Sequence, residues 1–188
     1  MNSTLLVLIV VIVAVVLLGL LIYSTTGRRR SDALRQHYGP EYDHALQNSN
    51  GKVEAESKLL ARSKRSKELD IQPLDGEARK RYNLAWTAAK ADFVDDPDRA
   101  IATADELVNE VMRERGYPID GFEQQAADVS VGHPDVVSQY RSAHAIAVAR
   151  GKGEASTEES RQAMIHYRAM FDELIAAPES TAQAHRVA

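Results

Sequence analysis

An unbroken apolar run from Leu5 to Ile22 is the feature that most constrains this chain of 188 residues. The run contains no charged residue and no proline. At about 1.5 Å per residue, a helix of this length covers about 27 Å, close to the thickness of the hydrocarbon core of a bilayer. A helix also satisfies every backbone amide of a single segment in lipid. The run therefore predicts a transmembrane helix over residues 5–23, preceded by a short flank at residues 1–4.

A cleaved signal peptide is the alternative interpretation of this run. Such peptides begin with a basic stretch, have an apolar core of about 7–15 residues and end at a small-residue cleavage site. Residues 1–4 contain no Lys or Arg, the apolar run is longer than such a core, and residues 24–27 do not match such a site. The pattern favours a retained anchor.

The charges that flank the run predict its orientation. Arg28, Arg29, Arg30 and Arg35 follow it, whereas the N-terminal flank carries only the α-amino group. Positively charged flanks tend to stay on the cytoplasmic side of a membrane. We therefore expect a single-pass protein of the cell membrane with its C-terminal domain in the cytoplasm.

Charge also divides the rest of the chain into two parts. Residues 28–67 have a balance of +5, and residues 68–188 have a balance of −9. Basic residues beside an anionic leaflet contribute about 1 kcal/mol each. The pattern predicts a basic juxtamembrane helical stalk at residues 24–72 and an acidic domain at residues 73–176. Nucleic acid is not an expected partner, because nucleic-acid binders carry a basic face on the recognition domain.

Helical signals separated by Pro and Gly recur through the soluble part and predict an all-α fold. The expected domain is an antiparallel bundle of about four to five helices. Local signals mark the helix ends, with N-caps at Asp75, at Asp96 and at Ser156 or Thr157, and a C-terminal glycine at Gly116. After Pro178 the pattern is lost, and we expect a disordered tail at residues 177–188.

Two groups of basic residues within the predicted stalk form a candidate membrane-surface patch. Its members are Arg28, Arg29, Arg30, Lys58, Arg62, Lys64, Arg65 and Lys67. Such a patch is suited to anionic lipid headgroups. The alternative is a solvated stalk helix whose charges only keep it in water.

The search for chemistry predicts no catalytic residue and no cofactor. The chain has no cysteine, which excludes disulfides, thiolate nucleophiles and Cys-based metal sites. It also lacks the motifs of a phosphate loop, a nucleophile elbow, a zinc protease and an EF-hand. His144 and His166 lie near the apolar faces of their helices and are the candidate metal ligands, with Asp128 as a possible third. A structural role for both histidines is the favoured alternative.

Five short motifs stand out between Tyr38 and Ile175. They are Phe93-Val94-Asp95-Asp96-Pro97, residues 111–118, His133-Pro134, residues 153–158 and residues 164–168. As a set, they resemble a family of small bacterial single-pass membrane proteins to which no activity is assigned. The resemblance implies membrane attachment and a helical domain, and it brings no catalytic residue and no ligand.

These observations together predict a membrane-anchored protein that is not an enzyme. Its expected partners are the lipid bilayer and another protein that binds the helical bundle. One alternative is a small-molecule or metal-sensing module, on the strength of His144 and His166. Another is an envelope-associated structural stalk, if the orientation is reversed.

Overall fold

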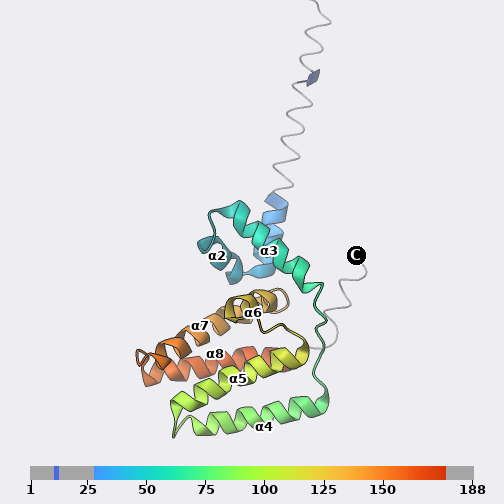
Figure 1. The fold of residues 1–188 in the computed structure, drawn as a ribbon. Coiled ribbons are helices and arrows are strands. Elements are labelled where there is room, and N and C mark those ends of the chain that lie inside the picture. The colour runs from blue at the N-terminus through green and yellow to red at the C-terminus, as the bar shows by residue number, and fades with distance from the viewer. Residues whose placement is uncertain (1–10, 13–27, 177–188) are drawn as a thin grey trace, which may run out of the picture.

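The computed structural model describes residues 11–12 and 28–176, and every regular element within these ranges is helical. The all-α prediction is confirmed for this part of the chain. Residues 28–38 form the first helical segment of the body. The labelled helices in Figure 1 are α2 (Pro40–Gln47), α3 (Lys52–Ser66), α4 (Gly76–Asp92), α5 (Pro97–Arg115), α6 (Phe122–Val129), α7 (Pro134–Gly151) and α8 (Thr157–Ala176).

Two predictions fall on residues that the structure does not describe. The transmembrane helix expected at 5–23 lies outside the described residues except at Val11 and Ile12, and the tail at 177–188 lies outside them entirely. None of the described helices is both long and apolar enough to cross a membrane. The membrane anchor therefore stays a prediction from the sequence.

Helices α4 to α8 form a bundle, which confirms the helical-bundle prediction. The consecutive pairs α4–α5 and α7–α8 run antiparallel, and α5 packs against α8 (Figure 1). Their apolar faces make one continuous core, whose large members include Tyr82, Trp86, Val108, Met112, Tyr140, Tyr167 and Phe171. The rings of Trp86 and Phe171 lie 4.7 Å apart between centroids and join α4 to α8.

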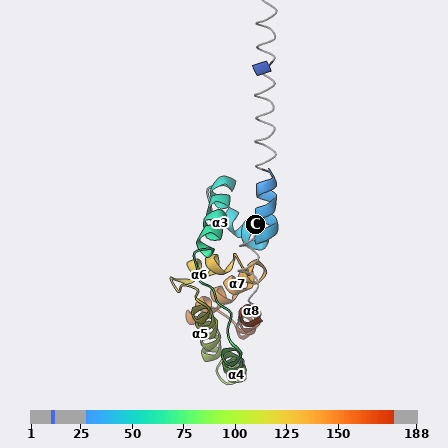
Figure 2. The same ribbon diagram turned by 90° about the vertical axis from the view of Figure 1, so that its right-hand side faces the viewer.

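Residues 28–66 form a separate unit, here called the N-terminal layer. Its helices pack around a small core of Leu34, Tyr38, Tyr42, Ala45, Ala55 and Leu59. The sequence predicts a stalk in this region, but α3 folds back beside α2 and buries Leu59. Figure 2 shows the layer stacked on one end of the bundle, against α6 and α7. The described part therefore has two cores.

Helix ends follow the predicted caps because capping depends on neighbours in sequence. The side chain of Asp75 accepts a hydrogen bond from the Ala78 amide at 2.7 Å, and Asp96 accepts one from the Arg99 amide at 3.0 Å. Before α8, Ser156 and Glu159 form the reciprocal bonds of a capping box. These caps fix where the bundle helices begin.

The linker at residues 67–75 is tied to the C-terminal end of α5. Gln72 donates its amide to the Arg115 carbonyl at 2.8 Å, and Arg115 donates to the carbonyls of Gln72 and Leu174 at 3.2 and 2.9 Å. Gly116 ends α5 with φ of 96°, and a Cβ there would lie 2.4 Å from the Asp70 carbonyl oxygen. A glycine is required both by this φ and by the close passage of the linker.

Candidate functional site

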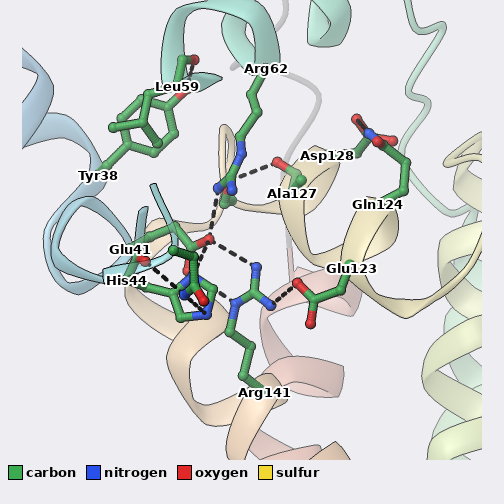
Figure 3. Close-up of polar contacts among 12 residues, drawn as sticks. Tyr38, Glu41, His44, Leu59, Arg62, Glu123, Gln124, Ala127, Asp128 and Arg141 are labelled. Carbon is green, nitrogen blue, oxygen red and sulfur yellow. Dashed lines mark hydrogen bonds and ion pairs between the residues drawn. The ribbon is translucent and has the colours of Figure 1, made fainter. Parts of the chain in front are cut away.

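A buried carboxylate, Glu41, joins the N-terminal layer to the bundle. Its side chain is 1% exposed, and Arg62 of α3 donates to it at 2.7 Å. Arg141 of α7 donates to both oxygens, at 3.2 and 3.0 Å. Figure 3 shows the two guanidinium groups converging on this one carboxylate from different helices. We call these three side chains the junction.

The local sequence explains how Glu41 reaches this position. Gly39 adopts φ of 48° and Pro40 begins α2, so the chain turns sharply between the helical segment 28–38 and α2. Glu41 then lies in the first turn of α2, on the side that faces α3 and α7. An acidic residue is also favourable there, because the N-terminal end of a helix carries partial positive charge.

Glu41 stays ionised in the junction. Burial alone would raise the pKa of its carboxyl, but the hydrogen bonds and charges of Arg141 and Arg62 outweigh burial and lower the pKa below its ordinary value. Removing one partner from a buried ion pair costs roughly 3–5 kcal/mol, because a charge is left without compensation. A carboxylate held by two guanidinium groups is a poor proton acceptor, so the junction is suited to holding helices together.

A second buried carboxylate also joins α3 to the bundle. The side chain of Asp128 in α6 is 0% exposed and accepts hydrogen bonds from Arg65 at 3.0 and 3.3 Å and from Gln124 at 2.8 Å. Arg65 also donates to Asp120 at 3.2 Å. Two arginines of α3, one helical turn apart, therefore bind carboxylates of α2 and of the α6 region.

The junction borders an open hollow with a volume of about 740 Å³. Its lining includes His44, Phe122, Glu123, Arg141 and His144. The rings of Phe122 and His144 are stacked, 3.6 Å apart between centroids. Burial, followed by the charge of Arg141, lowers the pKa of His44, so this imidazole is uncharged at neutral pH. Because Arg141 is already paired with Glu41 and Glu123, the hollow offers ring surfaces more than free charge.

The predicted metal ligands have different surroundings in the structure. His144 stacks on Phe122, whereas the Nδ1 atom of His166 is buried and has no hydrogen-bond partner among the described residues. Asp128, the expected third ligand, binds Arg65 and Gln124. Within the part of the chain that the structure describes, no group of three or more His, Asp or Glu side chains is placed to hold a metal ion.

The residues of the predicted membrane-surface patch lie in several environments. Arg28, Arg29, Arg30, Lys64 and Lys67 are exposed. Lys58 contacts Glu54 and the turn before α3. Arg62 is mostly buried and binds Glu41, whereas Arg65 is partly exposed and binds both buried Asp128 and exposed Asp120. Whether the patch contacts lipid stays a prediction.

Sequence reasoning did not identify Glu41 and Asp128 as partners of arginines. Glu41 stands out only weakly, as one of a few acids in a basic region and as part of an E-x-x-H spacing with His44. Its partner Arg141 lies 100 residues further along the chain. No local pattern reports a pairing over that separation.

Comparisons with known proteins found no match: no protein-family model, no curated protein and no solved structure is similar to this chain. The resemblance to small bacterial single-pass membrane proteins therefore stays a prediction.

Proposed function

We propose that this chain is a membrane-anchored, non-enzymatic protein-interaction module of the cell membrane, with its helical body in the cytoplasm. The observation that carries the proposal is the apolar run Leu5–Ile22, followed directly by Arg28, Arg29 and Arg30 and then by a folded helical body. The run is long enough to span a bilayer, and the arginines favour the cytoplasmic side.

Helix α4 is the surface that we assign to the protein partner. It lies at the end of the body opposite the N-terminal layer (Figures 1 and 2). Leu84 is 72% exposed there, and Lys80 and Arg81 lie one helical turn before it and are also exposed. Because Lys80 pairs with Glu77 and Arg81 pairs with Glu114, this surface suits a partner segment that presents an apolar side chain to Leu84.

Membrane extraction at high pH tests the anchor. The full chain should remain in the membrane pellet, and a chain lacking residues 1–27 should move to the supernatant. Recovery of the full chain in the supernatant contradicts the anchor. An alkaline phosphatase fused after Ala188 should be inactive, and an active fusion contradicts the cytoplasmic placement.

Site-specific crosslinking tests the partner surface. A photo-crosslinker at exposed Ala88, one turn after Leu84, should give one adduct of defined mass in cells. The substitution Leu84→Asp should abolish this adduct, and Val148→Asp on α7 should retain it, because Val148 is exposed on a different helix. Equal loss with both substitutions, or no adduct at all, contradicts a partner at α4.

A further inference from the structure

The first turn of α3 exposes an aliphatic side chain beside a lysine. Val53 is 85% exposed, and neighbouring Lys52 is exposed as well. A single exposed valine is ordinary on a protein surface and by itself indicates nothing. What makes Val53 informative is its position relative to the cations of the N-terminal layer.

The N-terminal end of α3 and the start of the helical segment 28–38 lie at the same end of the molecule. Figures 1 and 2 show this in two perpendicular views. Arg28, Arg29 and Arg30 are exposed at that start. Four cations and one exposed valine, from segments more than twenty residues apart, therefore lie at the end of the body where residue 28 begins.

The turn that carries Lys52 and Val53 is held in place. Lys58 donates to the Asn48 carbonyl and to the Ser49 hydroxyl, both at 3.1 Å, and it pairs with Glu54 at 2.8 Å. Glu54 in turn accepts the Asn50 amide at 2.9 Å. This network neutralises Glu54 and fixes the direction in which the first turn of α3 points.

The cations further along α3 are arranged differently. Arg62 and Arg65 are bound to the buried carboxylates Glu41 and Asp128, and the Arg65 side chain, which also pairs with Asp120, remains 41% exposed. At the layer's outer end, Arg28, Arg29 and Arg30 are exposed near one exposed acid, Asp32. Lys52 pairs with the partly buried Glu56 at 3.7 Å and its side chain remains 57% exposed.

We propose that this end of the N-terminal layer docks on an anionic lipid surface, with residues 28–30 and Lys52 at the headgroups and Val53 entering the headgroup layer. The inference rests on the proposed membrane anchor. It keeps residues 28–30 of the predicted patch, but on α3 it assigns the lipid contact to the first turn instead of to residues 58–67. A surface of cations around a small apolar tip matches the interfacial region, which is anionic outside and apolar beneath.

Single-cysteine labelling tests the contact, because the chain contains no cysteine of its own. Full-length V53C and V94C carry an environment-sensitive fluorophore and are reconstituted into phosphatidylcholine vesicles with or without phosphatidylglycerol. Val94, in the turn between α4 and α5, is 84% exposed and lies at the opposite end of the body, so V94C is the matched control. Lipids with a quencher in the upper acyl chain report depth.

The label at residue 53 should shift its emission to the blue and be quenched in anionic vesicles only, while the label at residue 94 should show neither change. Since one basic residue near an anionic surface contributes about 1 kcal/mol, Lys52→Gln should lower the ratio of docked to undocked layer about fivefold. Lys90→Gln on α4 should leave that ratio unchanged.

The failures are distinguishable. If the chain floats with the vesicles but both labels stay in water, the docking inference is overturned and the anchor stands. If both labels are quenched, the body lies along the membrane and the end-on contact is overturned. If the chain does not float with the vesicles, the proposed anchor fails and the docking inference fails with it.

Discussion

The bundle and the N-terminal layer are both helical, but polar groups contribute differently to their stability. The bundle has one large apolar core, and the buried hydroxyl of Tyr140 makes no hydrogen bond among the described residues. In the layer, Tyr38 donates to the Leu59 carbonyl at 2.9 Å, and Tyr42 donates to Glu56 at 2.9 Å. The layer is further attached to the bundle by the junction.

This difference follows from the amount of apolar surface that each unit can bury. A small unit buries a lower fraction of its surface and gains less from the hydrophobic effect. The layer has few buried apolar side chains, so hydrogen bonds and ion pairs decide whether it stays folded and docked. The bundle should tolerate the loss of polar contacts and should be sensitive to cavities in its core.

The largest effect should come from a cavity in the bundle. Phe171 is fully buried against Trp86, so Phe171→Ala should lower the free energy of unfolding by about 3–5 kcal/mol. Urea unfolding followed by circular dichroism measures this loss, and hydrogen exchange should accelerate across both units. Exchange that accelerates only in α8 would contradict a single cooperative bundle.

The junction should give the next largest effect, confined to the layer. Glu41→Gln leaves Arg62 and Arg141 without a carboxylate and should cost about 3 kcal/mol, at the lower end of the range for a broken buried ion pair. Hydrogen exchange should accelerate in residues 28–66 and remain slow in α5 and α8. The matched control is Glu123→Gln, which also removes a partner of Arg141 but at an exposed position, and it should cost less than about 1 kcal/mol. Equal losses for both variants would show that burial of Glu41 does not matter.

A pair of tyrosine substitutions compares the two units directly. Tyr38→Phe removes two hydrogen bonds, to Leu59 and Ser63, and should cost about 1 kcal/mol. Tyr140→Phe removes a buried hydroxyl without a hydrogen-bond partner in the described structure and should raise stability by up to about 1 kcal/mol. Chemical denaturation measures both changes. The same sign for both would contradict the proposed difference.

The smallest effect should be a pH dependence of stability that arises from His133, between α6 and α7. Burial, together with the charge of Arg115, lowers the pKa of His133 from its ordinary value of 6.5, and the hydrogen bond to Glu173 opposes this only in part. Below pH 6.5 the unfolded chain therefore binds a proton before the folded protein does, and stability falls as the pH falls toward the lowered pKa. His133→Asn should flatten this slope, measured by thermal unfolding between pH 8 and pH 5. An unchanged slope in the variant would assign the dependence to another group.

The sequence predicted the parts of the fold that depend on neighbouring residues. Asp75, Asp96 and Ser156 cap helices as expected, because an N-cap and its amide lie only a few positions apart. Tyr82 and Trp86, at helical spacing on α4, are both buried in the core. These signals depend only on neighbouring residues, so tertiary packing does not change them.

What the sequence did not reveal depends on distant parts of the chain. The N-terminal layer reads as a stalk because α3 is rich in charge, yet two of its arginines are compensated by carboxylates from α2 and α6. Val53 and Leu59 look alike as apolar residues of one helix, but Val53 is exposed and Leu59 is buried. Only the packing of α3 against Tyr38 decides between them.

The tie between the linker and the end of α5 affects how the body would respond to force. Arg115 holds the Gln72 carbonyl of the linker and the Leu174 carbonyl of α8 at the same time. Tension that enters through the N-terminal layer would pass to α6 and α7 at the arginine–carboxylate contacts and, along the linker, to the ends of α5 and α8 at Gln72, before it reached α4. Helix α4, which carries exposed Leu84, is shielded from that load, so a partner bound there would stay attached to an undistorted surface.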